Sequence, residues 1–74
     1  MARPTAAALG QMLDSVGWME VDVDGFDVSR FVGDRRTRQL VERNLEILSE
    51  ASRRVSSDHK ATEPAVDWTA LASL

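Results

Sequence analysis

The chain has 74 residues, a formal net charge of −3, and neither cysteine nor tyrosine. This length allows one small domain, residues 1–74, and the lack of cysteine excludes a disulfide framework or a thiolate metal site. The longest apolar run, residues 6–9, is too short to cross a membrane or direct secretion, so we expect a soluble cytoplasmic protein.

The first predicted helix covers residues 4–23, and Pro4 suits its first position. Gly10 and Gly17 weaken a helix by up to about 1 kcal/mol each, so we expect them to allow close contact with another helix. Trp18 lies beside the apolar row and is interpreted as a core or interface anchor rather than a ligand-stacking residue. The apolar row itself repeats every three or four residues and is expected to pack against the central helix: Leu9, Met12, Val16, Met19 and Val23.

A short helical turn is predicted at residues 28–32, after Gly25 ends the first helix. Asp27 is the expected cap of this turn. Phe31 and Val32 are expected to pack beneath the two long helices.

The longest predicted helix covers residues 34–56 and is the central element of the fold. Asp34 is its expected N-cap, and Glu50 is spaced to pair with Arg54 one turn later. An apolar stripe follows its buried face: Thr37, Val41, Asn44, Leu48, Ala51 and Val55.

Asn44 lies within this stripe, where a buried amide without a partner costs about 1 to 3 kcal/mol. Two interpretations stay open for it. Its partner lies inside the protein and fixes helix register, or the amide makes contact across a dimer seam or with a further helix.

Residues 56–66 are predicted to be a linker, because Ser56, Ser57 and Asp58 favour caps and turns and Pro64 stops a helix. A last helix begins at residue 68 after a capping aspartate, Asp67. It reaches only about two turns before the sequence ends, so we expect an incomplete C-terminal helix that packs its apolar residues onto the others.

Basic residues concentrate on the central helix, since residues 34–54 contain six arginines against four carboxylates. Three arginines, Arg35, Arg36 and Arg38, lie in its first turn, where the helix dipole disfavours cations. They either pair with the nearby carboxylates or bind phosphate. The carboxylates in question are Asp22, Asp24, Asp27 and Asp34. Together with Arg43, the three arginines are our candidates for binding RNA phosphates or a partner.

No motif in the sequence indicates a catalytic or metal centre. His59, the single histidine, lies in a polar stretch and is interpreted as an ordinary solvated residue. No metal site and no cofactor is predicted, because no second histidine and no cysteine is available. A DNA-binding helix-turn-helix that uses the arginines fits poorly with the acidic remainder of the chain.

Three segments in register resemble the HepT-like toxins, small all-α proteins of the HEPN superfamily. They are Asp34-Arg-Arg-Thr37, residues 43–51 (RNLEILSEA) and Pro64-x-x-x-Trp68-x-Ala-Leu71. The resemblance covers residues 4–74 and is strongest over 34–51. It implies an all-α, HEPN-like antiparallel helical bundle that forms a homodimer. It also implies a metal-independent ribonuclease toxin, neutralised by a minimal nucleotidyltransferase antitoxin that can adenylylate it.

In that family, an R-x4-6-H-x-Y motif follows the tryptophan-containing segment, and residues 1–74 hold no counterpart of its arginine, histidine or tyrosine. We therefore name no catalytic residue and expect the chain as written to be inactive. Two hypotheses stay open: a ribonuclease-class toxin known from a truncated sequence, or a non-catalytic helical module that dimerises or binds the antitoxin.

Apolar side chains on the central helix predict self-association: Leu40, Val41, Leu45 and Leu48.

Overall fold

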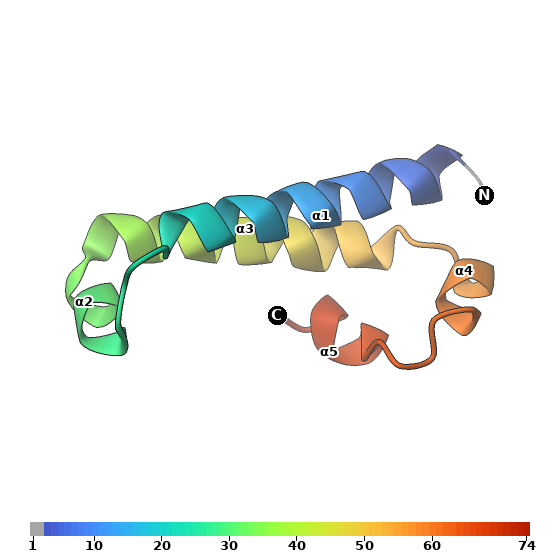
Figure 1. Ribbon diagram of the computed structural model, residues 1–74. Coiled ribbons are helices and arrows are strands. Elements are labelled where there is room, and N and C mark those ends of the chain that lie inside the picture. The colour runs from blue at the N-terminus through green and yellow to red at the C-terminus, as the bar shows by residue number, and fades with distance from the viewer. Residues whose placement is uncertain (1–2) are drawn as a thin grey trace.

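The computed structural model describes residues 3–74, which form helices and connecting turns with no strand (Figure 1). The elements are α1 (Arg3–Asp22), α2 (Val28–Gly33), α3 (Arg35–Arg53), α4 (Ser57–Ala61) and α5 (Trp68–Ala72). The all-α prediction is therefore confirmed.

The two long helices, α1 and α3, lie side by side in opposite directions and set the elongated shape of 41 × 20 × 17 Å. The short helix α2 forms the corner between them, and α4 lies at the far end. The helix α5 returns along the second half of α3 (Figure 1). Each short helix therefore contacts or extends one end of a single helical hairpin.

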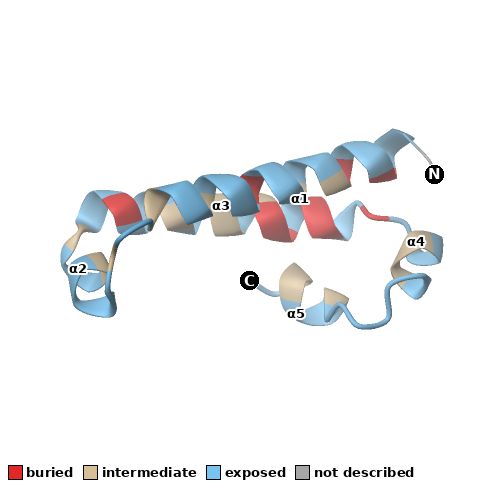
Figure 2. Ribbon diagram, viewed as in Figure 1, coloured by how far each residue is buried: buried red, intermediate tan, exposed pale blue. Residues whose placement is uncertain are grey.

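Small side chains form the contact face of α1, since Thr5, Ala8 and Ser15 are its buried residues. They pack against α3, whose buried apolar residues include Leu48 and Ala51 (Figure 2). Short side chains on one helix allow the two axes to approach closely. The hydroxyl of Thr5 is satisfied at the same time, because it accepts a hydrogen bond from the Ser56 amide at 3.1 Å.

This arrangement corrects the predicted packing of α1. The row that begins at Leu9 was expected in the core, but Val16 is 39% exposed and the other members are half-buried. Gly10 and Gly17 were expected to allow close contact with another helix, yet no atom of another described element lies within 4 Å of a Cβ placed at either position. Trp18 is 63% exposed, so the core interpretation is wrong for it. The helix is turned so that its hydroxyl and alanine row faces α3.

The cap predictions for the first connection are confirmed. Asp27 accepts from the Arg30 amide at 2.7 Å and starts α2, and Asp34 accepts from the Thr37 amide at 2.9 Å and starts α3. Gly25 follows α1 with a φ of 75°, a left-handed conformation that glycine adopts without strain. Val32 is exposed rather than packed beneath the long helices, because the short helix α2 turns only Phe31 of its three apolar side chains partly inward.

The second half of the chain differs from the sequence prediction in two places. Residues 57–61, expected to be a linker, form α4, because Ser56 accepts from the His59 amide at 3.2 Å and caps a new helix. The same capping tendency that ends α3 therefore starts α4. The expected Glu50–Arg54 pair is absent from the described residues, and Arg54 donates to the Gln11 side chain of α1.

The helix α5 begins at Trp68, as predicted, with Asp67 accepting from the Ala70 amide at 3.0 Å. The Trp68 indole donates to the Glu63 carbonyl at 3.2 Å, and the Lys60 ammonium lies 5.7 Å from its ring centre. These contacts fold the segment after α4 back on itself and direct α5 toward α3.

Enlarging Ala8 tests whether close contact between α1 and α3 holds the fold together. We expect Ala8→Leu to lower the free energy of unfolding by about 1 to 3 kcal/mol, because the fully buried site has no room for the added carbons. The control is Ala7→Leu on the exposed side of the same turn, which keeps the same helix propensity. Urea unfolding followed by circular dichroism measures both, and equal stabilities would contradict the assignment.

Candidate functional site

Four exposed arginines gather where α2 meets α3, and we call them the arginine corner: Arg30, Arg35, Arg36 and Arg38. Three of them were predicted from the sequence, and Arg30 was not. The guanidinium of Arg30 lies 4.0 Å from the ring centre of Phe26, which holds it on α2. Arg30 could have been predicted from the cap at Asp27, because that cap places Arg30 in the short helix just before α3.

Asp34 lies within the arginine corner and acts as a cap. The Thr37 amide donates to its carboxylate, and this hydrogen bond is the main reason that the pKa of Asp34 lies below its ordinary value. The positive charge of Arg30 lowers the pKa further. Asp34 therefore stays ionised at neutral pH and keeps the start of α3 in place.

The structure does not pair the arginines with the nearby aspartates. Within residues 3–74, the salt bridge present joins Arg43 to Glu46 at 3.4 Å, on an exposed face of α3. The carboxylates of Asp27 and Asp34 accept from backbone amides instead. The pairing interpretation is therefore wrong within the described residues, and phosphate binding remains the prediction for the corner. Arg43, already paired, stands apart from it.

Asn44 finds its partner within its own helix. Its Nδ2 donates to the Leu40 carbonyl one turn earlier at 3.1 Å, and the residue is half-buried. A bond inside one helix satisfies the amide but does not fix the register between two helices. The predicted role of Asn44 at a dimer seam stays untested.

His59 lies in α4, at the opposite end of the hairpin from the arginine corner (Figure 1). It is half-buried rather than fully solvated, and its backbone amide donates to Ser56. Residues 3–74 contain no cluster of histidine and acidic side chains suited to a metal ion. The histidine and the corner arginines are thus too far apart to act on one phosphate.

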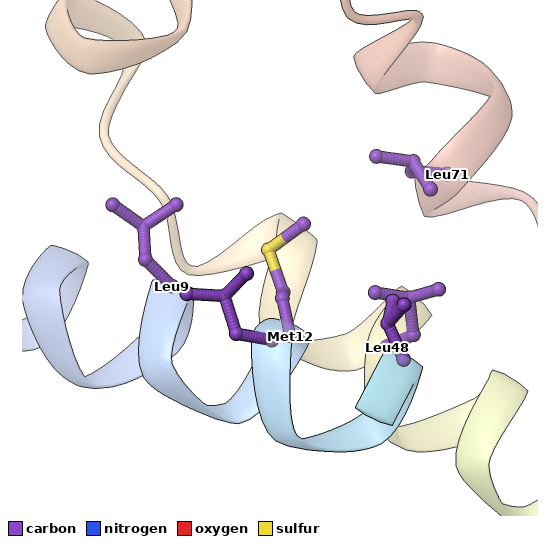
Figure 3. A pocket seen from close by; sticks show the side chains of 6 residues that line it. Leu9, Met12, Leu48 and Leu71 are labelled. Carbon is purple, nitrogen blue, oxygen red and sulfur yellow. The ribbon is translucent and has the colours of Figure 1, made fainter. Parts of the chain in front are cut away.

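An open apolar groove of about 370 Å³ lies between α1, α3 and α5. Figure 3 shows Leu9 and Met12 from α1, Leu48 from α3 and Leu71 from α5 around it. Leu13 and Val16 complete the lining. The row of α1 that was expected in the core forms much of this groove, which has no polar side chain and suits an apolar surface rather than chemistry.

Two polar side chains of α3 hold α5 over the end of this groove. Arg53 donates to the Ala72 carbonyl at 2.8 Å, and the Ser49 hydroxyl donates to the same carbonyl at 3.1 Å. Arg53 also donates to the Ser49 hydroxyl at 3.0 Å. This junction could not be predicted, because serine and arginine at these spacings are typical of a solvated helix face.

The fold and these surfaces define a small all-α protein built on an antiparallel helical hairpin. The family model described as ribonuclease HepT-like matches residues 12–74, and the chain belongs to this family. The resemblance identified from the sequence is thereby confirmed. No curated protein and no solved structure matches the chain. Within residues 3–74, no helix has the length and hydropathy needed to cross a bilayer.

Removing the Asp34 carboxylate tests its role at the arginine corner. The pKa of Asp34 is lower in the folded protein than its ordinary value of 3.8. The ionised carboxylate therefore stabilises the fold fully above pH 3.8, and this stabilisation is lost as the pH falls through the folded-state pKa. We expect Asp34→Ala to lower the thermal unfolding midpoint at pH 7, with a difference that shrinks toward pH 2. Asp24→Ala, at an exposed turn residue, is the control. A difference in midpoint between Asp34→Ala and the unchanged chain that stays constant from pH 7 to pH 2 would contradict this role.

Proposed function

We propose that this HepT-like chain is a single cytoplasmic domain of the toxin class, and that residues 1–74 bind RNA without cleaving it. Its partner in this proposal is a minimal nucleotidyltransferase antitoxin. Family membership supports the class. The observation that carries the proposal is the arginine corner, where Arg35, Arg36 and Arg38 lie exposed without salt bridges at one end of the described hairpin.

The chemistry of these side chains supports phosphate binding. Guanidinium groups donate in a planar fork that matches two phosphate oxygens, and they are less strongly hydrated than ammonium groups. Arg35, Arg36 and Arg38 are all exposed in the first turn of α3, whereas Thr37 between them is buried. A single strand that follows this turn contacts several of them at once.

The separation of His59 from the arginine corner supports binding without cleavage. Cutting RNA without a metal needs a group that transfers a proton near pH 7 beside a cation that stabilises the phosphate. Arginine stays protonated at this pH, and His59 lies at the other end of the hairpin. The corner therefore has the cations for holding a phosphate but no adjacent proton-transfer group.

Neutralising the corner tests RNA binding. We expect the variant Arg35→Gln, Arg36→Gln and Arg38→Gln to bind a labelled single-stranded RNA at least about tenfold more weakly than the unchanged chain. The slope of log Kd against log salt is expected to fall by about 2, since each lost phosphate contact removes about 0.7. Fluorescence anisotropy at several salt concentrations measures both quantities. The single change Arg36→Gln is measured as well, and Arg54→Gln, at the other end of α3, is its single-charge control.

The same samples test cleavage, with structured and single-stranded RNA in the presence of EDTA. We expect intact RNA throughout, for the unchanged chain and for His59→Ala alike. Cleavage that is abolished by His59→Ala would overturn the proposal and make His59 a catalytic residue. Equal binding by the corner variant and the unchanged chain would remove the arginine corner from the RNA-binding surface.

A second candidate function is a non-catalytic helical module that forms a homodimer or holds the antitoxin. The observation that favours it is the apolar groove, whose residue Val16 is 39% exposed and whose lining carries no charge. A second copy that covers this groove removes apolar surface from water. Leu40 of α3, outside the groove lining, is also half-exposed.

A charged residue in the groove tests the dimer. We expect sedimentation equilibrium to show a dimer for the unchanged chain and a monomer for Val16→Glu, because the partner would bury an unpaired carboxylate. Val32→Glu, on the exposed side of α2, introduces the same charge elsewhere and is the control. A monomer for all three chains at micromolar concentration would rule the dimer out.

A further inference from the structure

The outer side of α1, opposite α3, carries large apolar side chains that the described residues leave exposed. Leu13 is 74% exposed, Trp18 63% and Val21 66%. They surround a shallow depression of about 310 Å³, which Asp14 and Gly17 also line. We call these five residues the outer face of α1. It is a different surface from the arginine corner and shares only Leu13 with the apolar groove.

Gly17 gives this face its shape. A glycine in a helix interior costs up to about 1 kcal/mol relative to alanine, so its position usually serves a close contact. Apart from the neighbouring residues and backbone of α1 itself, no atom of residues 3–74 lies within 4 Å of a Cβ placed at Gly17 or at Gly10, one turn before Leu13. The space above Gly17 is therefore open to a side chain or backbone from outside, with Leu13, Trp18 and Val21 around it.

The charged side chains of the chain segment that forms the outer face all have one sign. From Pro4 to Ser29 the chain contains no lysine or arginine, and all of its charged side chains are carboxylates: Asp14, Glu20, Asp22, Asp24 and Asp27. Asp14 lines the depression itself, and Glu20 is exposed beside Val21. A helix surface that combines exposed aromatic and aliphatic residues with carboxylates is complementary to a surface of lysines, arginines and apolar residues.

We propose that the outer face of α1 is a docking surface for a basic amphipathic helix of another protein. Its apolar stripe would lie along Leu13 and Val21, with one side chain in the depression above Gly17, and its cationic flank beside Asp14 and Glu20. RNA is disfavoured here because carboxylates repel phosphates. A second copy of the chain is disfavoured because two acidic faces would meet. The proposal is independent of RNA binding at the arginine corner.

A model peptide tests this surface on the complete chain. The probe is a fluorescein-labelled helical peptide of about 18 residues with leucine on one face and lysine on the other. We expect saturable binding by anisotropy, weakened at least about tenfold by Trp18→Ser and by the double change Asp14→Lys with Glu20→Lys. The peptide with glutamate in place of lysine is expected not to bind.

Two controls separate the outer face from general charge attraction. Glu42→Lys with Glu50→Lys makes the same change in net charge on α3 and should leave the peptide affinity within about twofold. Val32→Ser removes an exposed apolar side chain elsewhere and should do the same. Equal losses from both charge reversals, equal binding of the glutamate peptide, or no binding at all would overturn the proposal. So would self-association that Trp18→Ser abolishes, since a second copy would then occupy this face.

Discussion

The contact between α1 and α3 is the constraint on which the other features depend. It uses alanine and hydroxyl side chains on α1, chiefly Thr5, Ala8 and Ser15, against the stripe of α3. A close contact of small groups buries little apolar area, so each residue in it matters more than in a large core. It also fixes the rotation of α1. Once the small residues face inward, the large apolar residues of that helix must face sideways or outward.

That rotation creates the apolar groove and the outer face of α1. The row through Leu9, Met12 and Val16 turns to the side and forms one wall of the groove beneath α5. Leu13, Trp18 and Val21 turn fully outward. A helical hairpin of this size cannot cover more than one face of each helix, because three further short helices supply only a few apolar side chains. Exposed apolar surface is thus a consequence of the hairpin itself.

The sequence predicted the helices better than their orientation. Capping aspartates give local signals, so Asp27, Asp34 and Asp67 located three helix starts correctly. Periodicity also located the stripe of α3. It failed for α1, where two rows repeat every three or four residues and the more apolar row was chosen. Whether a hydroxyl can be buried depends on a partner far away in the chain, such as Ser56 for Thr5, and local pattern does not report this.

For the candidate sites too, the sequence predicted which residues cluster but not how they contact one another. Clustered arginines were visible in the sequence, but the way in which the aspartates are used was not, because a carboxylate that caps a helix is no longer placed to pair with its neighbours. The corner arginines therefore form no salt bridge within residues 3–74, while residues 4–29 carry only negative charge. One end of the hairpin suits an anion and the long outer side of α1 suits a cation. Such a separation of charge lets one small chain hold two partners without competition between them, because each surface repels the ligand of the other.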